Sequence, residues 1–295
     1  MRYDLCLPWY WEYDDVFVGM VERACIEEGI SLWQIKPDNL LESITALYRG
    51  VATFKILLDR GQGEPAFDPI PRWARENCVR RINPAEVSAW SEDKATMHLE
   101  FITAGLNTPY TIVLPSFLEQ PVISPIDLTS FGGNFVIKPS NGGGGEGVII
   151  GASGMGEIFQ ARMEFPEQKY LIQSYIAPQI IEEKSAWFRV FYANGETYPC
   201  WWATDTHIYT NVTGEEEARY GLGKLRDITK RIASICKLDW FSTEIALTDD
   251  FVVVDYVNDE IDTRVQSRAM DGVPDEIINS IARQLVKIAK DNLKA

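Results

Sequence analysis

Histidine and paired cysteine, the residues of many catalytic and metal sites, are scarce in this sequence. The two histidines, His98 and His207, are too few for a histidine-based metal site or a standard catalytic triad. The cysteines are odd in number and never spaced as C-x-x-C; they are Cys6, Cys25, Cys78, Cys200 and Cys236. This pattern predicts buried, reduced thiols of a cytoplasmic protein.

Basic residues and long apolar runs are also in short supply. The chain has 28 lysines and arginines against 43 acidic residues, and its net charge is −15. Such an acidic protein is poorly suited to bind nucleic acid or an anionic membrane surface. No apolar run is long enough to span a membrane, and residues 1–15 lack the apolar core of a signal peptide. We therefore expect a cytoplasmic protein with neither nucleic-acid nor membrane partners.

The most informative segment is a glycine-rich stretch between two runs rich in β-branched residues. The run 135–137 predicts a buried strand that delivers Lys138, and the run 148–150 predicts a second strand. Between them lie Gly142, Gly143, Gly144, Gly145, Glu146 and Gly147. Consecutive glycines are costly to order, so they suit a backbone that lies against a ligand and moves. Backbone N–H groups in such loops bind anions, and a lysine adds a positive charge. The stretch therefore predicts a phosphate-binding hairpin.

Other phosphate loops fit this stretch less well. Gly142, Gly144 and Gly147 satisfy G-x-G-x-x-G, but a dinucleotide fingerprint must open a helix, and here a strand follows. A P-loop carries its lysine after the glycines, whereas Lys138 precedes them. A protein-kinase loop needs His-Arg-Asp and Asp-Phe-Gly motifs, which do not follow. A flexible hairpin without a ligand remains an alternative.

Strands and helices are expected to alternate before this stretch. Apolar residues at helical spacing between 17 and 25, ended by Gly29, predict one helix, and residues 38–48 predict another. The expected strands are 3–7, 31–35 and 53–58. The alternation predicts a small parallel α/β domain over residues 1–84. Four arginines cluster near the end of this domain. They form either a solvated helix face or an anchor for an anionic substrate, and they are Arg72, Arg75, Arg80 and Arg81.

A further helix is expected between residues 91 and 105. Ser91 is the candidate N-cap, and Gly105 supplies a stop. Ala95, Leu99 and Ile102 recur at helical spacing and predict its buried face.

A hairpin near the C-terminus carries acidic residues on two paired strands. The runs 241–247 and 251–259 are joined by a short turn, and they bear Glu244 and Asp255. Strands paired across a tight turn bring such side chains close together. Buried like charges repel, so a dication is a natural partner, and oxygen ligands suit Mg²⁺. An exposed acidic hairpin without metal is the alternative.

From about Ser91 onward, the chain resembles the ATP-grasp superfamily. The resemblance rests on four segments in order: the helix with Lys94 followed by Gly105 and Thr108-Pro109, Lys138-Pro139 with the glycines, the strand 170–176, and the acidic hairpin. The patterns look most like those of D-alanine ligases, glutathione synthetases and RimK-type ligases. The resemblance implies an α/β (α+β ATP-grasp) fold, with a pre-ATP-grasp domain at 1–84 and an ATP-grasp domain at 85–295. The latter would divide into subdomains at about 85–176 and 177–295, which grip ATP.

The resemblance also implies roles for individual residues. Lys94, Lys138 and the amides of the glycine loop would hold the ATP phosphates. The hinge residues Gln173, Tyr175 and Ile176 would lie against the adenine, and Glu183, or its neighbour Glu182, would bind the ribose. Arg189 would reach the transferring phosphate or acyl phosphate. The metal ligands would be Glu244, Asp255 and Asn258.

The metal site departs from the family pattern at one point. The family separates its second acid from its asparagine by one residue, whereas two residues separate Asp255 from Asn258. Simple alternation would place these two side chains on opposite faces of the strand. Either a β-bulge restores the geometry, or Asp259 serves instead.

The implied activity is that of an ATP- and Mg²⁺-dependent carboxylate–amine ligase that acts through an acyl phosphate. Mn²⁺ is an alternative metal, the substrates would be a small-molecule carboxylate and an amine, and family habit implies a homodimer. Acceptor contacts are expected from Asp262, Arg264 and Arg268, and the pair Trp201-Trp202 would either pack in the core or wall the substrate pocket. A small-molecule kinase of the same fold and a non-catalytic nucleotide-binding module remain alternatives.

Overall fold

A parallel sheet flanked by helices forms the first part of the computed structural model, which describes residues 1–294. The strand order is β2-β1-β3-β4, with β1 (Arg2–Pro8), β2 (Leu32–Ile35), β3 (Thr53–Leu58) and β4 (Arg80–Ile82). The helices are α1 (Asp15–Glu28), α2 (Leu40–Tyr48) and α3 (Pro69–Glu76). Because side chains alternate along a strand, Leu5 and Leu7 pack in the cluster with α1, whereas Cys6 packs in the cluster with α2 and α3.

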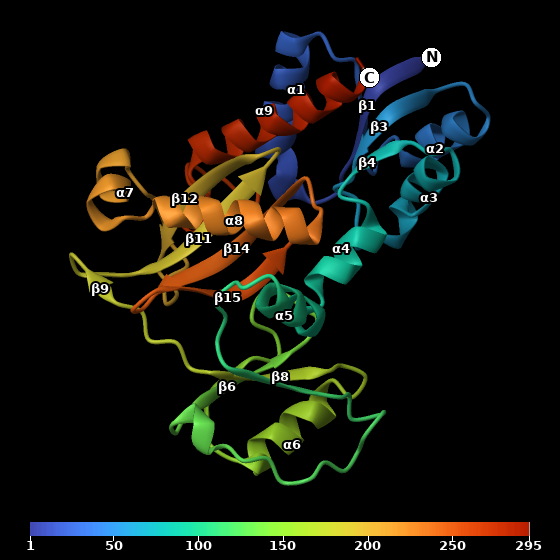
Figure 1. Cartoon of the computed structure of the whole chain (residues 1–295). Coiled ribbons are helices and arrows are strands. Elements are labelled where there is room, and N and C mark those ends of the chain that lie inside the picture. Colours follow the sequence, from blue (N-terminus) through green and yellow to red (C-terminus); the bar gives the residue numbers. More distant parts are fainter. Residues whose placement is uncertain (295) are drawn as a thin grey trace.

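The C-terminal helix α9 (Asp275–Asn292) returns to this first sheet and lies beside α1 (Figure 1). Ile277, Ile281 and Leu285 recur at helical spacing and are buried in the same cluster as Phe17 of α1. Gly29 caps the C-terminus of α1. Its φ of 67° is left-handed, and its N–H donates to the carbonyl groups of Cys25 and Ile26. The beginning and the end of the chain therefore share one hydrophobic core.

A small antiparallel sheet forms the opposite end of the molecule (Figure 1). Its order is β5-β8-β6-β7, with β5 (Thr111–Leu114), β6 (Phe135–Pro139), β7 (Ile149–Ala152) and β8 (Tyr170–Ser174). Helix α6 (Met155–Glu164) packs on one face, where Phe135, Ile137 and Ile158 are fully buried. The predicted strand–glycine–strand hairpin is β6 and β7.

A large antiparallel sheet lies between these two parts (Figure 1). Its order is β13-β12-β11-β14-β15, with β11 (Trp187–Ala193), β12 (Glu196–Trp202), β13 (Tyr209–Asn211), β14 (Trp240–Leu247) and β15 (Phe251–Asn258). Helix α8 (Gly223–Cys236) covers one face, and α7 (Gly214–Tyr220) precedes it. A short hairpin of β9 (Ile180–Ile181) and β10 (Lys184–Ser185) leads into the sheet.

Helices α4 (Ala85–Glu92) and α5 (Lys94–Thr103) connect the first part to the two antiparallel sheets, and here two predictions are wrong. The N-cap of α5 is Asp93, whose carboxylate accepts a bond from the Thr96 N–H, while Ser91 lies inside α4. Leu99 is 55% exposed and Ile102 is 48% exposed. Ala95 is buried as predicted, but the rest of the buried face carries Met97, His98 and Phe101, because α5 contacts β8, β15 and α8.

All five cysteines are free in the structure. Four of them are buried as predicted, but Cys78 is exposed, because it lies in the turn between α3 and β4 at a φ of 52°. No helix within residues 1–294 is long and apolar enough to cross a membrane.

A pH dependence of stability is expected from Asp59, the residue directly after β3. Burial raises the pKa of its carboxyl group from 3.8 to about 6, and the negative charges of Asp68 and Asp259 add to the effect. The folded state therefore prefers protonated Asp59, and the stability gained from this group is lost as pH rises from 4 through about 6.

The measurement is urea unfolding of the wild type and Asp59→Asn at pH 4.5 and pH 7.5. The free energy of unfolding of Asp59→Asn, relative to wild type, should rise between these pH values by about 1 to 2 kcal/mol. Asp205→Asn, on an exposed turn, is the matched control and should show no such rise. A difference between wild type and Asp59→Asn that does not change with pH would contradict the prediction.

Candidate functional site

The predicted phosphate loop and the predicted acidic hairpin face one cleft of about 550 Å³. One wall comes from the small sheet, through β6, the glycine loop and the end of β8. The other wall comes from β11, β14 and β15 of the large sheet. The two sheets thus bring together residues that lie far apart in the sequence.

The glycine loop needs its glycines for backbone geometry. Gly142, Gly144, Gly145 and Gly147 all have a positive φ, between 63° and 107°, where other residues are strained. A Cβ added at Gly147 would also lie 2.7 Å from the Phe165 ring. Nothing contacts a Cβ placed on the four consecutive glycines, so this part of the loop is open toward the cleft that it lines.

Both predicted phosphate-binding lysines reach this region. The Lys94 ammonium group, at the start of α5, donates a hydrogen bond of 2.7 Å to the Gly142 carbonyl. Lys138, at the end of β6, donates one of 3.2 Å to the Val254 carbonyl of β15. Burial lowers the pKa of Lys138, although the charges of Asp255 and Glu244 oppose this effect. The cleft therefore holds a desolvated positive charge beside the acidic hairpin.

Glu244 and Asp255 are direct partners in the pairing of β14 with β15. The register shifts on both sides of this pair, so β15 carries irregularities between Val253 and Asn258. As a result the Asn258 amide donates a hydrogen bond of 3.1 Å to the Asp255 carboxylate. Of the two residues predicted as the third metal ligand, Asn258 lines the cleft. Asp259 is 5% exposed, and its carboxylate accepts a hydrogen bond from the Asn83 amide outside the cleft.

The electrostatics of the two carboxylates differ. Burial raises the pKa of Glu244, even though Arg189 lies beside it. Burial alone would raise the pKa of Asp255 too, but the charges of Lys94 and Lys138 bring it below its usual value. The pair thus combines one readily ionised carboxylate, Asp255, with one whose ionised form is disfavoured by burial, Glu244.

Arg189 lies on β11 directly opposite Glu244, and its guanidinium is 3.2 Å from that carboxylate. It also lies over the Trp202 ring, 5.1 Å from the centroid, and donates to the Tyr209 hydroxyl at 3.4 Å. Its Nε is buried without a protein partner. The guanidinium is therefore held in the cleft by Glu244, Trp202 and Tyr209, with its Nε donor unpaired within residues 1–294.

The hinge residues line the cleft, but Glu183 does not. Gln173 is 2% exposed, and its amide donates to the Tyr256 hydroxyl at 2.8 Å, so this side chain braces the hinge. Tyr175 and Ile176 follow it along the cleft wall. Glu183 is exposed in the turn between β9 and β10, at a φ of 67°, and is absent from the cleft lining, as is Glu182. The structure therefore places neither predicted ribose acid at the cleft.

Several cleft residues escaped the sequence analysis. The Trp187 indole N–H donates a hydrogen bond of 3.0 Å to the Glu244 carboxylate. The His207 ring stacks on Trp202, with 5.4 Å between the ring centroids. Strand alternation could have revealed Trp187, which lies two residues before Arg189 on the same face. No local signal marks His207.

Of the tryptophan pair, Trp201 is buried in the core and Trp202 lines the cleft. Of the expected acceptor residues, Asp262 and Arg264 line it and Arg268 does not.

The donor set suits a magnesium ion. Residues 1–294 contain no cluster of three or more His, Cys, Asp or Glu side chains that could hold a metal by themselves. Glu244, Asp255 and the Asn258 amide instead offer oxygen ligands at one place. Mg²⁺ prefers one or two carboxylates plus phosphate oxygens and water, which fits this small set.

Comparison with solved structures identifies the fold. The D-alanine–D-alanine ligase of Bacillus anthracis, complexed with ATP, superimposes with a TM-score of 0.61 at 14% identity, over 99% of each chain. A RimK domain ATP-grasp protein from Sphaerobacter thermophilus gives 0.61 at 18% identity, over 94% of this chain and 97% of that one. The ATP-grasp ligase PsnB, complexed with a minimal precursor, Mg and ADP, gives 0.61 at 12% identity, over 95% and 98%.

The chain therefore has the ATP-grasp fold, and the resemblance inferred from the sequence is confirmed at the level of the fold. No family model matches the sequence. No match was found among curated proteins either.

Proposed function

We propose that this protein is an ATP- and Mg²⁺-dependent carboxylate–amine ligase that works through an acyl phosphate. The observation that carries the proposal is the convergence of Lys94, Lys138, Arg189 and the Glu244–Asp255 pair on one cleft beneath the glycine loop. The solved ATP-grasp ligases of the same fold support the general kind of reaction. Mn²⁺ is a plausible substitute for Mg²⁺, since both take oxygen ligands.

The nucleotide is held by charge and by backbone groups. Lys94 and Lys138 neutralise the phosphates, and the glycine-loop amides donate to them. The wall formed by Tyr175 and Ile176 receives the base. Closure of the open glycine loop over the nucleotide excludes water, which would otherwise hydrolyse an acyl phosphate.

The reaction needs charge stabilisation more than a protein nucleophile. The substrate carboxylate attacks the γ-phosphorus and ADP leaves. The neutral amine then attacks the acyl carbon, and inorganic phosphate leaves with the bonding electrons and takes up the proton that the amine loses. Arg189 stabilises the negative charge that develops on the phosphoryl oxygens, and Trp202 fixes its guanidinium. Glu244, Asp255 and Asn258 would hold Mg²⁺, which supplies charge neutralisation at the transferring group.

The two alternatives gain less support. A kinase for an anionic acceptor would use free arginines, but Arg80 pairs with Asp239 and Arg81 with Glu86, and none of residues 72, 75, 80 and 81 lines the cleft. A non-catalytic module is suggested by the imperfect ribose acid and by the irregular metal motif. Neither Glu182 nor Glu183 lines the cleft, but the bulge in β15 brings Asn258 back beside Asp255. Cytoplasmic location and a homodimer remain parts of the proposal; the free cysteines fit the former.

The testing experiment is thermal unfolding with and without ATP and Mg²⁺. Nucleotide at about 100 times its dissociation constant should stabilise the protein by about 2.7 kcal/mol. In Glu244→Gln the part of this gain that depends on Mg²⁺ should be lost, whereas Asp249→Asn, on the exposed turn of the same hairpin, should retain it. The absence of any stabilisation of the wild type would overturn the proposal. Positive binding then justifies screening carboxylate and amine pairs for ADP release.

A further inference from the structure

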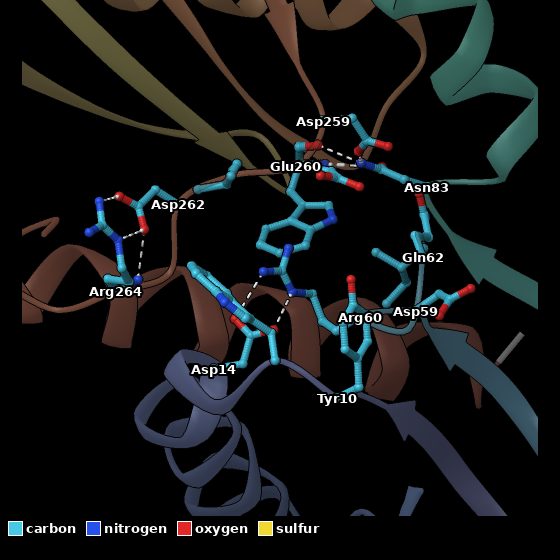
Figure 2. A pocket seen from close by; sticks show the side chains of 14 residues that line it. Tyr10, Asp14, Asp59, Arg60, Gln62, Asn83, Asp259, Glu260, Asp262 and Arg264 are labelled. Carbon is cyan, nitrogen blue, oxygen red and sulfur yellow. Dashed lines mark hydrogen bonds and ion pairs between the residues drawn. The ribbon is translucent and has the colours of Figure 1, made fainter. Parts of the chain in front are cut away.

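A second cavity, of about 520 Å³, lies at the edge of the first sheet (Figure 2). It is lined by residues that follow β1, such as Tyr10, by residues that follow β3, such as Asp59, and by the segment 259–264 after β15. The carboxyl ends of parallel strands are a common place for ligands in α/β proteins. The cavity therefore lies where the first sheet can contribute to substrate binding.

Both arginines of this cavity are already neutralised. The Arg60 guanidinium donates to the buried Asp14 carboxylate at 3.1 and 2.9 Å (Figure 2). The Arg264 guanidinium donates to Asp262 at 3.0 and 2.8 Å and pairs with Asp271 at 3.1 Å. Each arginine is therefore matched by at least one carboxylate, and neither leaves an unbalanced positive charge for an anionic ligand.

Three further carboxylates line the cavity without a cationic partner among the described residues. Asp59 accepts only the Gly61 N–H, at 2.9 Å, and Asp259 accepts from the Asn83 amide. Glu260 is exposed, and its carboxylate makes no hydrogen bond or ion pair within residues 1–294. The lining therefore carries more carboxylates than arginines.

Aromatic side chains complete the wall. Tyr10 and Trp11 are each 38% exposed, so part of each ring remains open to a ligand. Figure 2 shows the Tyr10 side chain at the lower edge of the cavity. Aromatic faces attract ammonium and guanidinium groups, as the Arg60 guanidinium 5.8 Å from the Trp240 ring centroid illustrates within this cavity. The lining therefore combines two features that favour a cation.

The cavity adjoins the nucleotide cleft. Asp262 and Arg264 line both spaces. Asn258 lines the cleft, and the next residue, Asp259, lines the cavity. A substrate that reacts in the cleft can therefore extend past the Asp262–Arg264 pair into the cavity.

We infer that this cavity holds a second, positively charged group of the amine substrate, which is then a diamine or a basic amino acid. The inference rests on the proposed ligase function. One amino group reacts in the cleft, and the distal ammonium or guanidinium group lies between the unpaired carboxylates and the open aromatic faces. The charge of the lining disfavours a phosphorylated or dicarboxylate amine.

Isothermal titration calorimetry of the full-length protein tests this with 1,5-diaminopentane, L-lysine, pentylamine and glutarate as probes. We expect 1,5-diaminopentane to bind at least about tenfold more tightly than pentylamine, because a charge-assisted contact is worth roughly this factor. Tighter binding of L-lysine than of the diamine would identify a basic amino acid as the class. Glutarate should not bind.

The variant that tests the lining is Asp59→Asn combined with Glu260→Gln. It should fold, because Glu260 is exposed and the Asp59 carboxylate is disfavoured by burial. We expect it to bind the diamine no better than pentylamine. Asp205→Asn combined with Glu215→Gln changes the charge equally at exposed sites outside the cavity and should preserve the preference.

Stabilisation by ATP and Mg²⁺, measured on the same samples, separates the two proposals. If ATP stabilises the protein but the diamine does not bind, binds no better than pentylamine, or binds equally to the cavity variant, the cavity inference is overturned and the ligase proposal stands. If the diamine shows the expected preference and ATP gives no stabilisation, the cation pocket is supported and the ligase proposal is overturned.

Discussion

Lys138→Ala should reduce ATP-dependent turnover by about a hundredfold to a thousandfold. The Lys138 ammonium group lies between the glycine loop and the acidic hairpin, where burial already lowers its pKa. A charge in such a desolvated position interacts strongly with phosphate oxygens, and loss of one such donor typically costs two to three orders of magnitude. The measurement is steady-state ADP release with saturating amine and carboxylate.

Lys169→Ala is the matched control for Lys138→Ala. Its side chain is 47% exposed and lies 4.0 Å from Asp93, outside the cleft. This variant should keep wild-type turnover. Unchanged turnover in Lys138→Ala, in a sample with wild-type unfolding temperature, would remove Lys138 from the proposed site.

Asp255→Asn should lower turnover by about a hundredfold to a thousandfold and raise the Mg²⁺ concentration needed for half-maximal rate. The change keeps the shape of the side chain and removes the readily ionised member of the carboxylate pair. Glu244 cannot replace the lost negative charge, because its carboxylate already pairs with the Arg189 guanidinium at 3.2 Å. A metal bound by few carboxylates depends strongly on each of them.

The matched comparison is Asp249→Asn, on the turn that joins the same two strands. Asp249 is exposed and lies outside the cleft, so its replacement should alter neither turnover nor the Mg²⁺ dependence. Equal Mg²⁺ dependence in wild type and Asp255→Asn would show that the metal is held elsewhere.

Local sequence patterns predicted those parts of the site that form between neighbouring segments. The strand–glycine–strand hairpin around Lys138 and the pairing of Glu244 with Asp255 each involve two strands joined by a short connection. Pairing across such a connection is determined by turn chemistry and alternation, both of which can be read from the sequence. The periodicity of α1 and its glycine stop are local in the same sense.

Register irregularities and helix environment could not be predicted in this way. The sequence left Asn258 and Asp259 open as metal ligands, because a bulge in β15 depends on how that strand twists against its partner. The buried face of α5 was misjudged, because this helix contacts a strand from each sheet as well as α8, so exposure at Leu99 and Ile102 follows from their arrangement.

The sequence by itself determined the strand–glycine–strand hairpin and the pairing of Glu244 with Asp255, since each follows from local strand pairing. The ATP-grasp fold was predicted from the resemblance to that superfamily. Only the tertiary structure decided that Glu183 lies away from the cleft and that Trp202 and His207 line it. The same holds for the second cavity, whose lining spans Tyr10 to Arg264. Its carboxylates become neighbours because Asp14, which pairs with Arg60, also accepts a hydrogen bond from the Thr263 hydroxyl and so ties the segment 259–264 to the first sheet. Such long-range contacts leave no periodic trace in the sequence.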